Sequence, residues 1–111
     1  MQDLIQLRKE IHQHPELSGF EKETAKRVVN FIEPFGPDEI ITNVGGDGIL
    51  IVFNGKEPGK TVLFRAELDA LPIQEVNDFS YKSLTDNVSH KCGHDGHATI
   101  LCGLAKKLSS D

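Results

Sequence analysis

The feature that most limits the fold is the middle of the chain, where three apolar runs rich in β-branched residues are separated by glycine-containing turns. Residues 39–44 (EIITNV) and 48–54 (GILIVFN) flank the Gly-Gly-Asp-Gly turn, which predicts a β-hairpin. Residues 61–70 (TVLFRAELDA) begin as a continuous apolar run and are predicted to form a buried strand. Three strands among helical segments indicate an α/β protein.

Helical periodicity precedes these strands. Residues 3–15 carry apolar side chains at helical spacing, and the helix is predicted to stop near Pro15 because the residue before proline disfavours helical geometry. A second helix follows, with Ser18 and Glu21 at capping-box spacing. Its apolar face runs to the Pro-Phe-Gly-Pro segment at residues 34–37, which is predicted to end it.

The rest of the chain is a polar segment followed by another apolar helix. Residues 71–91 are irregular and are predicted to be mostly loop, whereas residues 96–110 have helical periodicity. Cys102 lies among leucines inside that helix, which is typical of a small buried thiol. Because no further strands are present to complete a sheet around residues 61–70, the chain is predicted to be the front part of a larger α/β domain.

Composition excludes several classes of function. Twelve Lys and Arg against seventeen Asp and Glu give a net charge of -5, and no basic cluster is present to bind nucleic acid. No apolar stretch is long enough to span a membrane, and the N-terminus lacks the apolar core of a signal peptide, so we expect a cytoplasmic protein. Two cysteines in 111 residues are too few for a disulfide framework, so free thiols are expected.

The run HKCGHDGH, directly before the last helix, concentrates metal-binding side chains. A cysteine thiolate and an imidazole are suited to zinc and related divalent ions, which favours Cys92 and His94 as ligands. The glycines allow a tight turn, and nearby polar groups can orient the ligands. Those predicted supporting residues are His90, Asp95 and His97.

Two other interpretations of this run stay open. In the first, the glycines simply form a turn, His90 makes a capping contact and Cys92 is a small core residue. In the second, Cys92, His94 and Asp95 form a nucleophilic relay for acyl transfer. The spacing disfavours this relay, because adjacent residues cannot easily point at one another in sequence.

Charged residues also gather at the end of the third apolar run. Arg65, Glu67 and Asp69 alternate, so a strand would place all three on one side. The carboxyl ends of strands are where α/β proteins usually build their sites, which makes this segment a second candidate. The alternative is an exposed strand end with a local salt bridge.

The segment HQHPE near the N-terminus is interpreted differently. His12 and Glu16 are one helical turn apart, and His14 precedes a proline. This spacing is more typical of a helix end with capping interactions than of a set of metal ligands. We therefore expect no direct chemistry from these residues.

The segments containing HQHPELS, DALPIQE and CGHDGH occur in an order that resembles the metal-dependent amidohydrolases, a family that includes aminoacylases, hippurate hydrolases, indole-acetyl-amino-acid hydrolases and related carboxypeptidases. The resemblance covers nearly the whole chain. It implies the N-terminal part of a three-layer αβα, zinc-exopeptidase-like catalytic domain spanning residues 1–111. In the complete protein, it also implies a smaller inserted domain through which two copies dimerise.

The same resemblance implies the chemistry. Such enzymes hold two divalent metal ions, with zinc or manganese favoured and nickel or cobalt as alternatives. Cys92 and His94 match the first two metal ligands, and Asp69 matches the aspartate that supports a ligand and aids water activation. The implied reaction is hydrolysis of the amide bond of an N-acyl amino acid or small peptide.

Two departures from the family pattern qualify this expectation. Glu67-Leu68-Asp69 stands where the family commonly has Asp-Met-Asp, a change that keeps the key aspartate. The chain also stops at Asp111, before the Glu-Glu pair and the later histidines that complete the family's site. We therefore predict that this chain supplies half a site and is inactive alone. The alternative is a truncated, inactive fragment with only a structural or interaction role.

Overall fold

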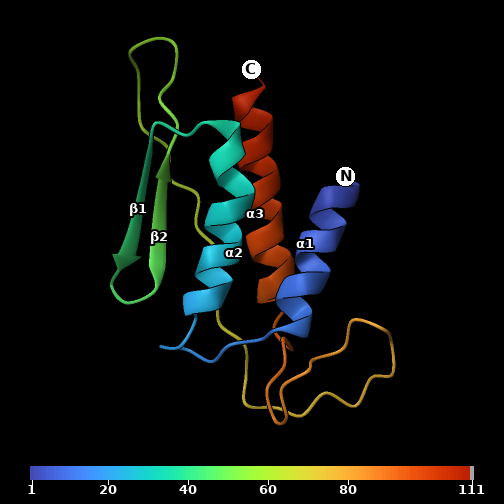
Figure 1. The fold of residues 1–111 in the computed structure, drawn as a ribbon. Helices are drawn as coiled ribbons and strands as arrows, with labels where there is room; N and C mark the ends of the chain where they lie inside the picture. The colour runs from blue at the N-terminus through green and yellow to red at the C-terminus, as the bar shows by residue number, and fades with distance from the viewer. Residues whose placement is uncertain (111) are drawn as a thin grey trace.

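The computed structural model describes residues 1–110, so Asp111, the last residue of the predicted domain range, lies outside the described part. Three helices pack together, and a two-stranded hairpin lies beside them (Figure 1). No helix in the described part is long and apolar enough to cross a membrane. The elements in order are α1 (Gln2–Gln13), α2 (Lys22–Ile32), the 3-10 helix η1 (Glu33–Phe35), β1 (Glu39–Val44), β2 (Gly48–Val52) and α3 (His94–Ser109).

The hydrophobic core lies where the three helices meet. Gly103 of α3 allows close packing, because a Cβ there would lie 3.2 Å from the side chain of Leu4 in α1. Burying one of the larger aliphatic side chains contributes about 1.5–3 kcal/mol. This core confirms the helical periodicity and the buried position predicted for Cys102. Its buried members are Leu7, Ile11, Val28, Ile32, Ala98, Cys102 and Ala105.

The start of α2 differs from the prediction. Ser18 makes no hydrogen bond within residues 1–110, so the predicted capping box is wrong. Instead the Glu16 carboxylate accepts hydrogen bonds from the backbone N–H of Glu23 at 3.3 Å and from the backbone N–H and the hydroxyl of Thr24 at 2.5 and 2.7 Å. A carboxylate at a helix N-terminus satisfies its unpaired N–H groups and favours the dipole. The capping role expected in the HQHPE segment is therefore made by Glu16.

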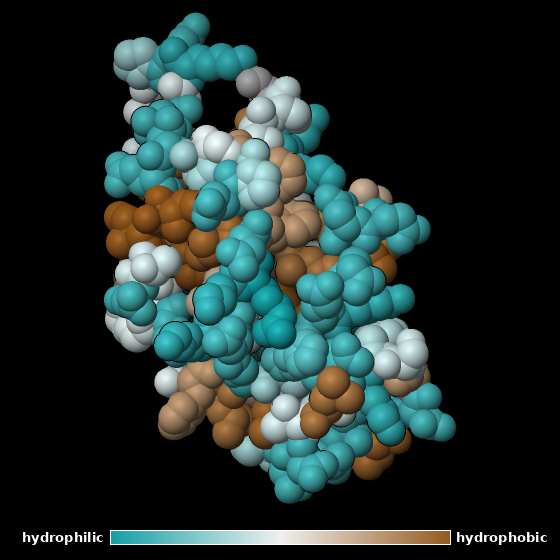
Figure 2. Space-filling view, in the orientation of Figure 1, coloured by the Kyte–Doolittle hydropathy of each residue, from teal (hydrophilic) through white to brown (hydrophobic). Residues whose placement is uncertain are grey.

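The predicted hairpin is confirmed. β1 and β2 pair antiparallel, with Ile41 opposite Leu50, and the turn places Gly45 and Gly46 at φ values of 61° and 122°. Glycine adopts such values without steric cost. Figure 2 shows an apolar patch over the hairpin, where Ile41 and Leu50 are exposed.

The strand predicted at residues 61–70 is wrong for the described chain. These residues form no strand, and their one ladder-type pairing is a parallel bridge between Ala70 and Leu17. A strand needs a neighbour for its N–H and C=O groups, and no described segment forms backbone hydrogen bonds with residues 61–69. Val62, Leu63 and Phe64 remain 70%, 74% and 57% exposed. The described residues consequently contain no three-layer sandwich.

The loop predicted at residues 71–91 is confirmed, and its ends are tied together. The backbone groups of Leu71 and Ser89 exchange hydrogen bonds of 2.9 and 3.0 Å. This pairing places the charged segment that ends at Asp69 beside the HKCGHDGH run at the start of α3. The chain thereby brings its two predicted site segments into contact.

Candidate metal centre

The site begins with the turn into α3. Gly93 has φ 78°, a left-handed conformation that costs glycine little, and the helix starts at the next residue. The prediction that a helix start carries the cluster is confirmed. His94 and His97, three residues apart, lie on the same face of α3 with ring centroids 5.8 Å apart.

Asp69 fixes the orientation of the His94 ring. The Nδ1 atom of His94 lies 2.8 Å from the Asp69 carbonyl oxygen and 2.9 Å from its Oδ1 atom. Both oxygens are acceptors, so Nδ1 carries the proton and donates. The lone pair of His94 then lies on Nε2, which is 3.8 Å from Oε1 of Glu67. A carboxylate that sets the tautomer of a histidine in this way is the usual support of a metal ligand.

Glu67 completes a group of three possible ligands. His97 donates from Nδ1 to Oε1 of Glu67 at 3.3 Å, and this hydrogen bond holds the pKa of the Glu67 carboxyl below its usual range. Ligand atoms of Glu67, His94 and His97 all lie within 4.8 Å of one another. Two imidazoles and one carboxylate are a donor set that suits zinc and related ions and leaves coordination positions open. The residues present therefore fit a divalent metal ion.

Cys92 is not a member of this group of three. Its thiol is free and the residue is exposed, so the interpretation of Cys92 as a small core residue is wrong. Cys102 is also free but fully buried, and burial raises the pKa of its thiol to about 12. The expectation of two free thiols is confirmed, and Cys92 is the exposed one of the two.

Comparison with known proteins identifies the relatives. The chain is 42% identical to the N-acyl-L-amino acid amidohydrolase of Geobacillus stearothermophilus over 96% of its own length, and 42% identical to the hippurate hydrolase of Campylobacter jejuni over 94%. It superposes with a TM-score of 0.92 and 36% identity on the YxeP protein of Bacillus subtilis, a dinuclear metal-binding peptidase of the M20 family, covering 98% of this chain. This chain is homologous to M20-family amidohydrolases and peptidases.

The homology covers only part of those proteins. The chain spans 29% and 27% of the length of the two enzymes and 30% of the solved M20 chain. No protein-family model matches the chain. The resemblance seen in the sequence is thus confirmed over the matched length.

The alternative relay of Cys92, His94 and Asp95 is not formed in this M20 homologue. His94 pairs with Asp69, whereas Asp95 is buried and accepts from Arg8 Nε at 3.0 Å and from His12 Nδ1 at 2.8 Å. The two neighbours in sequence point to different partners. This geometry bears out the argument that adjacent residues cannot line up as a relay.

The sequence did not predict the contacts of His12. It is 4% exposed, and its Nε2 atom lies 2.9 Å from Oε2 of Glu75, a residue of the 71–91 loop. The partners Asp95 and Glu75 are 83 and 63 residues away in the sequence, so no local spacing announces the contact.

Glu75 is ionised within this buried network. Burial raises the pKa of its carboxyl, but hydrogen bonds from the backbone N–H of Ser83 at 2.6 Å, from His12 and from Asn77 outweigh burial and lower the pKa from 4.5 to about 2. Lys91 adds an ammonium group 3.4 Å from Oε2. Glu75 is therefore a charged group inside the fold.

The remaining predicted residues fall in different surroundings. His90 is 5% exposed, neither of its ring nitrogens has a hydrogen-bond partner within residues 1–110, and burial lowers its pKa. Arg65 is exposed and makes no ion pair with the described residues. Of the three alternating charges, the structure brings Glu67 and Asp69 to α3 and leaves Arg65 outside.

Proposed function

We propose that this chain is the N-terminal portion, residues 1–111, of the catalytic domain of a dinuclear M20 hydrolase. In the complete protein it forms part of a three-layer αβα domain, and an inserted domain mediates dimerisation. The substrates are N-acyl amino acids or small peptides, whose amide bond is hydrolysed. The observation that carries this proposal is His94, held by Asp69 with Nε2 directed toward Glu67 and close to His97.

The residues have distinct roles in the proposed site. Cys92 and His94 are metal ligands, and Asp69 positions His94 by accepting its Nδ1 proton. When bound, two divalent ions lower the pKa of a shared water and polarise the amide carbonyl. Glu67 keeps a negative charge beside the two histidines. Zinc or manganese fits these donors best, and nickel or cobalt is also compatible.

The chain supplies only part of this site. The general base and the further ligands belong to the part of the M20 protein that lies outside the matched length. Ordering a loop around few ligands offsets much of the free energy of metal binding, so the chain alone binds metal weakly. We expect no amide hydrolysis by the isolated chain.

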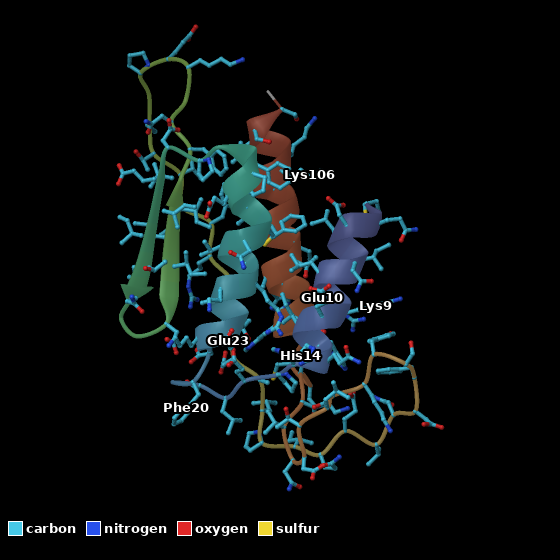
Figure 3. The ribbon with its side chains drawn as sticks, in the orientation of Figure 1. Lys9, Glu10, His14, Phe20, Glu23 and Lys106 are labelled. Carbon is cyan, nitrogen blue, oxygen red and sulfur yellow. The ribbon has the colours of Figure 1, made fainter. Side chains whose placement is uncertain are left out.

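A metal titration of the 111-residue chain tests this proposal. Calorimetry with zinc is expected to show binding that weakens about tenfold in Asp69→Ala, because the His94 ring loses its orienting acceptor. His14→Gln is the matched control, since the His14 side chain makes no hydrogen bond or ion pair with the described residues, and its backbone N–H bond to the Glu10 carbonyl is kept in the variant. His14 lies at the end of α1 (Figure 3).

Two results would contradict the proposal. The first is the absence of zinc binding by the unmodified chain. The second is an equal loss of affinity in Asp69→Ala and His14→Gln. Hydrolysis of an N-acyl amino acid by the pure chain, abolished by a chelator, would overturn the prediction that the chain alone is inactive.

A further inference from the structure

A set of buried polar contacts surrounds His12. Nδ1 of His12 lies 2.8 Å from Oδ2 of Asp95, and Nε2 lies 3.1 and 2.9 Å from the two carboxylate oxygens of Glu75. A neutral imidazole donates from one nitrogen only, whereas the imidazolium donates from both. Because each nitrogen faces a carboxylate, only the imidazolium satisfies both contacts with ionised partners.

The charges around this ring support that state. His12, Asp95 and Glu75 are 4%, 2% and 6% exposed, and an unpaired buried charge is strongly destabilising. Arg8 contacts Asp95 at 3.0 Å and Lys91 contacts Glu75 at 3.4 Å. The other titratable rings nearby are Tyr81 and His90, with centroids 5.7 and 6.4 Å from that of His12.

These contacts join three separate parts of the fold. His12 belongs to the last turn of α1, Glu75 to the 71–91 loop and Asp95 to the first turn of α3. The backbone carbonyl of Asp95 also accepts from the Thr99 hydroxyl at 2.8 Å, inside α3. We call His12, Asp95, Glu75 and Arg8 the His12 clamp.

The clamp holds the part of α3 that carries the metal group. Asp95 lies between His94 and His97 in the first turn, so the position of its side chain sets the rotation of that turn. The side chains of His94 and His97 do not share the partners of Asp95: His94 pairs with Asp69 and His97 pairs with Glu67. A shift of Asp95 therefore changes the directions of both imidazoles at once.

We propose that His12 is a positioning residue for the metal group: as an imidazolium between Asp95 and Glu75, it fixes the first turn of α3 so that His94 and His97 converge on Glu67. This inference rests on the proposed metal-binding function. No hydrogen bond, ion pair or ring contact joins His12 to Cys92 or to the group Glu67–His94–His97 within the described residues. The action of His12 passes through Asp95.

The test compares His12→Gln with the control His14→Gln in the 111-residue chain. Zinc affinity is measured by competition with a chromophoric chelator, at a temperature where circular dichroism shows both variants folded. His12→Gln is expected to bind zinc about tenfold more weakly, and His14→Gln within twofold of the unmodified chain. A purely structural ion pair would lower the unfolding temperature of His12→Gln and leave the zinc affinity of the folded protein unchanged, which overturns the proposal.

Two further measurements keep the inference testable if His12→Gln does not fold. In ¹⁵N-edited NMR of the unmodified chain at neutral pH, His12 is expected to show protons on both ring nitrogens, and a single ring N–H would overturn the proposal. The double variant His12→Gln with Glu75→Gln removes one cation and one anion. It is expected to fold and to recover part of the zinc affinity, because the buried charge balance is restored.

The outcomes separate this inference from the proposed function. If the unmodified chain binds no zinc, the proposed function fails. If the unmodified chain binds zinc and His12→Gln binds it equally well, only the positioning role of His12 fails.

Discussion

The two sides of the HKCGHDGH run behave in opposite ways. On the closed side, Asp95 is buried and its carboxylate is paired with His12 and Arg8. On the open side, His94 and His97 lie near Glu67, and the Nε2 atom of His94 accepts no hydrogen bond from the residues that the structure describes. Asp95, whose carboxylate is fully paired, is therefore the direct neighbour of His94, whose Nε2 atom can bind a ligand. The first turn of α3 therefore both stabilises the fold and contributes side chains to the candidate site.

Breaking the closed side is expected to have the largest effect. Asp95→Ala leaves Arg8 and the His12 cation without their buried partner, which costs about 3–5 kcal/mol of unfolding free energy. Urea unfolding followed by circular dichroism measures this loss. Asp86→Ala is the control, because Asp86 is exposed, and it is expected to change stability by no more than about 0.5 kcal/mol. Equal losses in the two variants would show that the clamp does not hold the fold.

Acid is expected to release the closed side in a defined range. The pKa of Glu75 is lowered from 4.5 to about 2 in the folded protein, so its contribution is complete above pH 4.5 and is lost as the pH falls toward 2. The shift corresponds to a contribution on the order of 3 kcal/mol. Urea unfolding at several pH values in this range measures the loss. Glu75→Gln should flatten that dependence, and an unchanged slope in Glu75→Gln would contradict the assignment.

The smallest expected effect concerns the open side and is measured by the reactivity of the two thiols. Cys92 is exposed, whereas burial raises the pKa of Cys102 to about 12, so a disulfide reagent should titrate one thiol in the folded chain and two after unfolding. Zinc is expected to slow the reaction of Cys92 severalfold if its thiolate is a ligand. No protection of Cys92 by zinc, in a chain that binds zinc, would remove Cys92 from the ligand set.

Local patterns predicted much of this architecture. The hairpin was predicted from the glycine-rich turn between two apolar runs, and the helices were predicted from the spacing of apolar residues. Residues 61–70 failed as a strand because a strand depends on neighbours, and a local apolar run does not reveal whether they are present. The Ser18 capping box failed because α2 begins at Lys22, where the Glu16 carboxylate accepts from the N–H groups of Glu23 and Thr24.

Two segments were singled out from local patterns, the ligand-rich run around His94 and the alternating charges that end at Asp69, and the structure brings them into contact. The ligand roles of these residues stay predictions. The clamp was not predictable, because His12 meets partners 63 and 83 residues away and its pattern resembles an ordinary helix end. Which side of a histidine-rich run is closed depends on long-range packing, which one sequence does not display.

The central claim is that this chain presents an oriented imidazole to a divalent ion. X-ray absorption at the zinc edge of the zinc-loaded chain tests it most directly, because imidazole rings give characteristic outer-shell scattering. We predict imidazole ligation at about 2.0 Å together with one sulfur at about 2.3 Å, from His94 and Cys92. The imidazole contribution should fall in His94→Gln. A zinc spectrum without imidazole scattering, or one unchanged in His94→Gln, would contradict the account.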